Sequence, residues 1–214
     1  MKQLSPEAIR RMKAALFLAC LIPFVRLAVG TRAGTLGADP VEAITHTTGL
    51  WSLRLLLLTL AITPLKCWTG LLWLMRLRRT LALYAFFYAS LHVAVYLIFD
   101  QYFDWPEILK DIAKRPHLTA GFAAFLLMVP LVITSTNGMM KRLGGRNWKL
   151  LHRLTYPIAA AAVLHFFWLV KKDVSEPTLY AAILSVLLCA RLVHRPRKTQ
   201  ASPPLATHRP FPLS

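Results

Sequence analysis

The sequence lacks most of what a soluble enzyme of its length would carry. Only 16% of its 214 residues are charged, where a soluble domain has about 25%, and no polar stretch is long enough for a separate globular domain. Its three cysteines, Cys20, Cys67 and Cys189, are isolated, and there is no C-x-x-C or C-x-x-C-H motif. These absences exclude a disulfide framework, a zinc ribbon and covalently attached c-type haem.

Acidic residues are also scarce, with nine Asp and Glu against 26 Lys and Arg and a formal net charge of +17. In a soluble protein this excess would suggest nucleic-acid binding. Here 56% of the residues are hydrophobic, and no basic helix is interleaved with polar, base-reading residues. The excess therefore indicates the inner-face loops of a membrane protein, which collect Lys and Arg, and we expect no nucleic-acid partner.

Long apolar runs are what the sequence has in their place. A membrane-spanning helix needs about 20 mostly apolar residues, and six stretches qualify. They are residues 13–29, 46–65, 80–99, 117–135, 151–170 and 178–194. The sequence predicts an all-α integral membrane protein, a six-helix bundle with short connecting loops, in which residues 13–194 form one transmembrane domain. Residues 1–12 are predicted to be a cytoplasmic N-terminus, and residues 195–214 a Pro-rich, basic and disordered cytoplasmic tail.

The predicted orientation follows from the basic residues of alternate loops. Seventeen Lys and Arg fall on the side of both termini, in residues 2–13, 66–79, 141–149 and 191–209, and six fall on the other side. Eight of the nine acids, all but Glu7, lie on that second side. The positive-inside rule therefore places both termini in the cytoplasm.

Two of the seven histidines lie deep inside apolar helices. His92 and His165 are each more than ten residues from the nearest predicted helix end on the inner side, and an ionisable residue at such depth suggests a function. At 1.5 Å rise per residue they lie about 18 Å and about 21 Å from the inner ends of the third and fifth helices. Equal depth suits the two axial ligands of one haem between these helices. The alternative for each is a neutral imidazole hydrogen-bonded to a neighbouring helix.

Three further residues, His152, Arg54 and Arg79, are candidates for binding a cofactor. His152 lies about 20 Å from His165 along the same helix, so it is either part of a second centre near the inner face or an interfacial polar residue. Arg54, eight residues into the second helix, is predicted either to bind a haem propionate through its bidentate fork or to extend to the outer interface. Arg79 is the second candidate cofactor-binding cation.

The outer loops 30–45 and 100–116 are candidates for a partner-docking surface. The second of them combines four acids with Tyr102, Phe103 and Trp105, and aromatic anchors within a charged rim suit an interface. An aromatic belt at the lipid boundary is the alternative.

Several segments, in their order and spacing, carry a resemblance over nearly the whole chain. They are GADPVEAITHTTG (37–49), LTLAITPLK (58–66), RRTLALYAFFYASLHVAVY (78–96), RPHLTAG (115–121), TSTN (134–137) and LGGRNWKLLHRLTY (143–156), followed by His165. The chain resembles the ferric-reductase-like transmembrane family, and within it the membrane haem-binding subunits of bacterial methionine sulfoxide reductase systems.

The resemblance implies haem b held by His92, His152 and His165, and it also implies an FMN. Relatives with two haems have a second histidine on the third helix near the cytoplasmic side, where this chain has Arg78 and Arg79. It further implies a multi-pass protein in the lipids of the bacterial inner membrane. Quinol or a cytoplasmic flavin reductase would donate electrons, and a periplasmic molybdopterin-containing methionine sulfoxide reductase catalytic subunit would accept them to repair oxidised proteins.

On this interpretation the chain is an electron-transfer subunit, and the catalytic site lies on a separate partner chain. The sequence has no glycine-rich dinucleotide fingerprint, so we expect that the chain does not oxidise NADPH by itself. Two alternatives remain open from the residues. One is a membrane ferric reductase, and the other is a small transporter or assembly factor whose histidines relay protons or bind a substrate.

Overall fold

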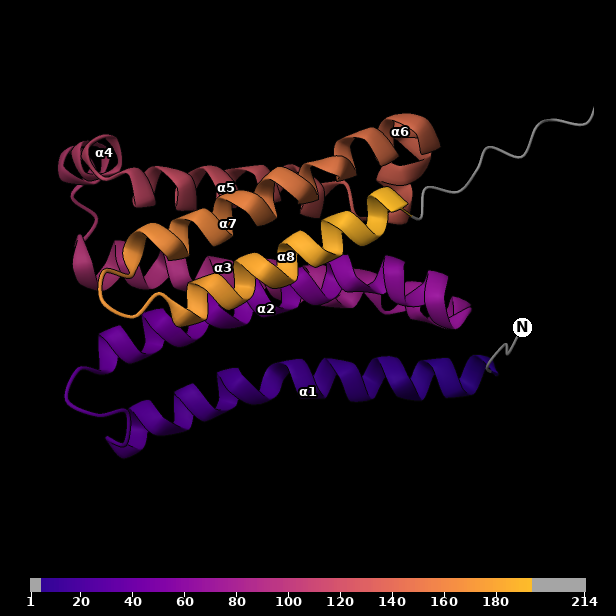
Figure 1. Cartoon of the computed structure of the whole chain (residues 1–214). Coiled ribbons are helices and arrows are strands. Elements are labelled where there is room, and N and C mark those ends of the chain that lie inside the picture. The colour runs from indigo at the N-terminus through magenta and orange to yellow at the C-terminus, as the bar shows by residue number, and fades with distance from the viewer. Residues whose placement is uncertain (1–4, 194–214) are drawn as a thin grey trace, which may run out of the picture.

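The computed structural model describes residues 5–193, which form a bundle of long helices (Figure 1). Six helical stretches are long and apolar enough to cross a membrane. They are α1 (Pro6–Ala33), α2 (Pro40–Thr69), Leu72–Asp100, α5 (Pro116–Ile133), Asn137–Leu169 and α8 (Ser175–Val193). The predicted all-α, six-span fold is confirmed. The predicted tail, residues 195–214, lies outside the described residues, as does the last residue of the sixth predicted span.

Two of the six stretches are composite. The third consists of the short helix η1 (Leu72–Arg76), α3 (Arg78–Val95) and the π-helical turn η2 (Tyr96–Asp100). The fifth consists of α6 (Asn137–Leu151), η3 (His152–Leu154) and α7 (Thr155–Leu169). Gly144, with φ of 72°, breaks the helical path inside α6, a conformation that glycine adopts without steric cost.

Local sequence explains why α1 and α2 run longer than predicted. Each begins with a proline that follows a capping residue, because Ser5 accepts from the backbone N–H of Ala8 and Asp39 accepts from that of Glu42. Each helix ends at a C-terminal glycine in the left-handed region, α1 at Gly34 and α2 at Gly70. Proline at the first position and glycine just past the last are the expected boundary signals, and they lie outside the apolar runs used for prediction.

Two of the connections that the sequence predicts as short loops contain helices of their own. The connection between α3 and α5 contains α4 (Trp105–Lys114), and that between α5 and α7 contains α6. In α4, Ile108 and Asp111 are buried while Trp105 and Leu109 are exposed. The helix is therefore amphipathic, and it is too short and too polar for the 20-residue apolar criterion to detect.

Helices α2, α3, α5 and α7 pack together in the centre of the bundle, α1 lies against α3 and α2, and α8 lies against α2 and α7. Figure 1 shows α4 at one end of the bundle and α6 at the other. The first turn of α1 and the last turn of α8 lie at the α6 end. The alternation of sides used to count basic residues thus matches the structure, and the cytoplasmic assignment of the α6 end remains a prediction from charge.

Polar side chains join the outer helices to the centre at proline positions. The Tyr88 hydroxyl on α3 donates to Cys20 O (2.7 Å) and accepts from Phe24 N (3.1 Å). It thereby bridges two backbone groups of α1 on either side of the helix-interior Pro23. On α8, Arg191 donates to Leu60 O (2.6 Å), a carbonyl that Pro64 leaves without its usual helical donor. Both contacts satisfy backbone groups for which the lipid core offers no partner.

Candidate cofactor site

A cavity of about 650 Å³ opens between α2, α3, α5 and α7 at the α4 end of the bundle. Its walls are largely apolar, with Leu53, Phe122, Phe125, Met128 and Ile158 among the lining residues. Volumes of about 300–1,000 Å³ with apolar walls and a few polar groups are typical of cofactor sites.

His92 and His165 lie together in this cavity. The two rings face each other from α3 and α7, with centroids 6.1 Å apart and planes inclined at 82°. Two imidazole nitrogens that share one metal lie about 4 Å apart, and the ring centroids about 2 Å further. The observed separation therefore fits an axial pair, and the structure brings together the two histidines that the sequence predicts to share one depth.

Each ring is oriented by a backbone carbonyl at the outer end of a neighbouring helix. His92 Nδ1 donates to Thr45 O (2.9 Å), and His165 Nδ1 donates to His117 O (2.6 Å). A carbonyl only accepts, so both rings carry their proton on Nδ1 and leave the Nε2 lone pair free. Metal-ligating histidines are held in this way, with the second nitrogen bonded to a carbonyl or carboxylate.

Two glycines make room for the histidine rings. A Cβ at Gly121 would lie 2.8 Å from His165 Nδ1, and one at Gly49 would lie 3.1 Å from the His92 ring. Both positions lie on helices, and both rings rest directly against backbone. Glycine at these positions therefore sets the positions of the rings. Gly49 and Gly121 form a glycine cradle that fits two opposed imidazole ligands.

No group of three or more His, Cys, Asp or Glu within residues 5–193 is arranged to hold a metal ion. The His92 and His165 pair supplies two nitrogens only. A porphyrin supplies the other four positions around its iron, so this donor set fits haem with protein-derived axial ligands.

His152 lies in a second, smaller cavity of about 310 Å³ nearer the α6 end. Its ring stacks on Trp148 with centroids 3.9 Å apart, and its Nδ1 donates to Trp148 O (3.0 Å). Its Nε2 is buried and has no hydrogen-bond partner. The structure therefore separates His152 from the His92 and His165 pair, as predicted from helix rise, and leaves the buried Nε2 of His152 without a hydrogen-bond partner.

The two arginines predicted to bind a cofactor have different surroundings. Arg79 lines the second cavity together with Arg78, and its guanidinium donates to Asn137 Oδ1 (3.4 Å). Arg54 lines neither cavity, because its Nε donates to Tyr180 OH (2.7 Å) on α8 and its guanidinium lies 5.6 Å from the centre of the Trp51 ring. Arg79 thus lies at a cavity and Arg54 contacts a neighbouring helix, and cofactor binding by either residue stays a prediction.

Sequence reasoning missed the residues that orient the histidines. Gly49, Gly121, and the carbonyls of Thr45 and His117 act through close approach and backbone, which residue type alone does not reveal. The sequence offered one sign of them. A glycine follows the outer start of an apolar helix in two places, at Gly49 after His46 and at Gly121 in RPHLTAG (115–121).

Comparison with known proteins identifies the family of the chain. A family described as "Ferric reductase like transmembrane component" matches residues 48–163, which include α3 with His92, α5, and η3 with His152, and which end two residues before His165. The chain belongs to this ferric-reductase-like transmembrane family.

Within that family, three bacterial relatives are each named "Protein-methionine-sulfoxide reductase heme-binding subunit MsrQ". The protein from Herminiimonas arsenicoxydans is 52% identical, over 88% of this chain and 87% of the relative. That from Ralstonia nicotianae is 48% identical over 88% of each chain, and that from Xanthomonas euvesicatoria is 56% identical over 81% of this chain and 82% of the relative. The chain is a member of the MsrQ family.

Proposed function

We propose that the chain is the haem b-binding, electron-transferring membrane subunit of a protein-methionine-sulfoxide reductase system in a bacterial inner membrane. One observation carries the proposal. His92 and His165 oppose each other at 6.1 Å in a cavity between four membrane helices, with both Nδ1 atoms engaged and both Nε2 atoms free to bind iron. The relatives named as haem-binding subunits support the choice of metal group.

The positions of the two cavities support conduction across the membrane. The outer cavity and the inner cavity share three wall residues, Leu56, Met128 and Ile158, so the two cavities are adjacent along the bundle. A redox group in each would span much of the bilayer in two short steps. Haem supplies reversible one-electron iron chemistry when bound, while the protein tunes its potential through the axial ligands and burial.

FMN is the group that we propose for the inner cavity. Arg78 and Arg79 line it from one side, and a guanidinium fork suits the phosphate of a flavin nucleotide. Because His152 carries its proton on Nδ1, its unpartnered Nε2 can accept a hydrogen bond from a ring N–H of the flavin. Electrons would enter here from quinol or from a cytoplasmic flavin reductase, since this is the end of the bundle to which the basic residues assign the cytoplasm.

The acceptor in this proposal is a periplasmic, molybdopterin-containing catalytic subunit that reduces methionine sulfoxide. It would meet the α4 end of the bundle, where the haem cavity opens. The relatives' name supports a methionine sulfoxide reductase system as the setting. The described helices hold the electron path, and the chemistry on methionine sulfoxide would occur on the partner.

The experiment is purification after expression with haem supply, followed by haem and flavin quantitation on one sample. We expect a Soret band and haem reduction by a quinol or by a flavin reductase. We expect reoxidation only when the catalytic subunit and methionine sulfoxide are both added. Reoxidation by chelated ferric iron but not by the partner would favour a ferric reductase, and a haem-free protein would favour the transporter or assembly-factor alternative.

A further inference from the structure

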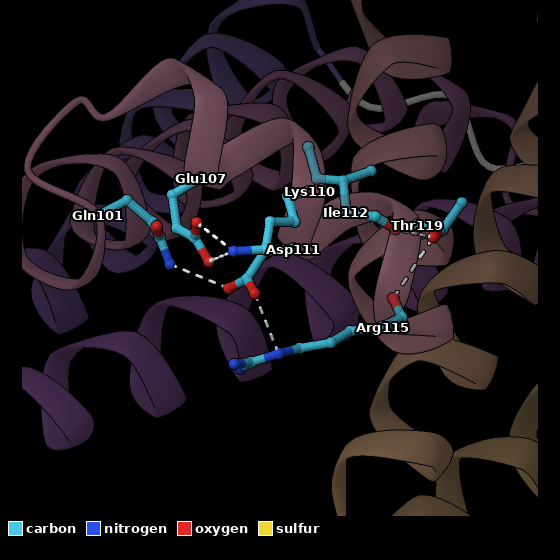
Figure 2. A network of polar contacts seen from close by, with 7 residues as sticks. All are labelled: Gln101, Glu107, Lys110, Asp111, Ile112, Arg115 and Thr119. Atoms are coloured by element: carbon cyan, nitrogen blue, oxygen red, sulfur yellow. Dashed lines mark hydrogen bonds and ion pairs between the residues drawn. The ribbon is translucent and has the colours of Figure 1, made fainter.

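Figure 2 shows a network of polar contacts around α4, three of whose residues, Gln101, Asp111 and Arg115, line the cavity that contains His92 and His165. Asp111, a buried acid on α4, accepts from Gln101 Nε2 (3.0 Å) and from Arg115 Nε (3.3 Å). Thr119 donates to the carbonyls of Ile112 and Arg115, which joins the end of α4 to the start of α5. The Arg115 side chain is 58% exposed, and the Nε edge of its guanidinium is paired with Asp111.

Arg115 also lines the cavity that contains His92 and His165. Arginine has five N–H donors on three nitrogens. Of the three guanidinium nitrogens of Arg115, only Nε has a hydrogen-bond or ion-pair partner among residues 5–193. The two terminal nitrogens thus form a free fork at the cavity mouth. A planar fork of this kind matches the two oxygens of a carboxylate.

Two hydroxyls at the same end of the cavity also lack partners. The Tyr96 hydroxyl and Thr45 Oγ1 are buried side-chain oxygens with no hydrogen-bond partner, and both residues line the cavity. A buried hydroxyl without a partner costs free energy, so a ligand with acceptor oxygens here would satisfy groups that the protein leaves open.

We propose that Arg115, rather than Arg54, is the binding residue for the propionate carboxylates of the haem, and that Asp111 and Gln101 are its positioning residues. The inference rests on the proposed haem-binding function and deepens it. Tyr96 and Thr45 donate the additional hydrogen bonds to the same carboxylates. These residues would hold the carboxylate edge of a bound porphyrin at the outer mouth, and Leu56 and Met128 would contact its apolar edge.

The apolar walls explain why the charged edge takes this direction. A carboxylate placed among Leu56, Met128 and Ile158 would have no hydrogen-bond donor and would be strongly disfavoured. At the outer mouth it meets a fixed cation, two hydroxyls and access to water. Asp111 in turn keeps the guanidinium in place when the site is empty of haem, because its second oxygen is held by Gln101.

The same α4 helix offers a matched control pair. Lys110 and Glu107 form an ion pair at 2.8 Å with side chains 51% and 48% exposed, and neither residue lines the cavity. The hydrogen bond from Lys110 lowers the pKa of the Glu107 carboxyl, so both groups are charged at neutral pH. Lys110→Gln therefore removes one positive charge from the same helix without touching the proposed carboxylate site.

The test compares haem-loaded wild-type protein with Arg115→Gln, Arg115→Lys and Lys110→Gln. Two quantities are measured, the rate of haem transfer to excess apomyoglobin and the midpoint potential of the bound haem. We expect Arg115→Gln to release haem about 10- to 100-fold faster, which corresponds to a lost charge-assisted contact. Its midpoint potential should fall, because a nearby cation favours the ferrous form, which carries one positive charge less than the ferric form.

Arg115→Lys keeps the charge but not the fork, so its potential should stay near that of the wild type while haem release is still faster. Lys110→Gln should match the wild type in both quantities. If haem release and midpoint potential in Arg115→Gln and Arg115→Lys equal those in Lys110→Gln, the role of Arg115 is overturned while the haem-binding proposal stands. A wild-type protein without a Soret band would overturn the haem proposal with it. If Arg115→Gln takes up no haem, the rate of haem release is compared between Arg115→Lys and Lys110→Gln. A faster rate in Arg115→Lys supports the inference, and equal rates overturn it.

Discussion

His92 on α3 and His165 on α7 lie with ring centroids 6.1 Å apart and ring planes 82° from parallel. Each ring is fixed from behind by one carbonyl and rests on one glycine. The pair is thus held apart at the distance that an iron atom requires, and it is held by backbone groups rather than by mobile side chains. Pre-set ligands of this kind lower the entropic cost of binding a cofactor.

The glycine cradle gives the first prediction. Gly121→Ala places a Cβ 2.8 Å from His165 Nδ1, so the ring or the helix must shift, and overpacking of this kind costs about 1–3 kcal/mol. Haem content per protein should fall, and the low-spin spectrum should weaken. Gly138→Ala is the control, since a Cβ there meets nothing within 4 Å. Equal haem content in the two variants, by pyridine haemochrome assay, would argue against the cradle.

Tyr88 gives a prediction about stability rather than about the site. Tyr88→Phe removes the hydroxyl that bridges Cys20 O and Phe24 N beside Pro23. Hydrogen bonds between membrane helices contribute about 0.5–2 kcal/mol, and each kcal/mol corresponds to about 2–4 °C in Tm for a chain of this size. The melting temperature in detergent should fall while the Soret spectrum stays unchanged. Tyr102→Phe, at a side chain 81% exposed, should leave the melting temperature unaltered.

The orientation of the bundle is tested by labelling single cysteines. In a background without the three native cysteines, Lys110→Cys on α4 and Lys141→Cys on α6 are both at exposed positions. A membrane-impermeant maleimide added to intact spheroplasts should label the first, and it should reach the second only after permeabilisation. The reverse pattern would mean that the distribution of basic residues had been misread and that the electron path runs in the opposite direction.

The sequence predicted the spans and the pairing of His92 with His165 because both follow from simple physics. Apolar length fixes which segments cross the bilayer, and helix rise fixes depth. It did not predict α4 or the end points of α1 and α2, which depend on capping residues and on amphipathic packing outside the apolar runs. It also did not predict the carbonyls of Thr45 and His117 as orienting groups.

Arg54 illustrates the limit of reasoning from depth alone. The sequence places an arginine within the outer half of α2, but helix rotation decides whether it faces a cavity or a neighbour. In the structure it faces Tyr180, while Arg115 lines the cavity. In the sequence Arg115 is one of six basic residues of the outer loops, and the α4–α5 turn that brings it to the cavity becomes visible only with the fold.

The central claim is that His92 and His165 form one axial pair and that His152 belongs to a separate site. The direct measurement is the low-spin electron paramagnetic resonance signal, with pyridine haemochrome content, of His92→Ala, His165→Ala and His152→Ala. We predict that either of the first two changes abolishes the bis-imidazole signal, and that the double variant loses no more, because both act on one site. His152→Ala should retain that signal, with the strong anisotropy expected of nearly perpendicular ring planes. Loss of the low-spin signal in His152→Ala together with its retention in His165→Ala would contradict the account.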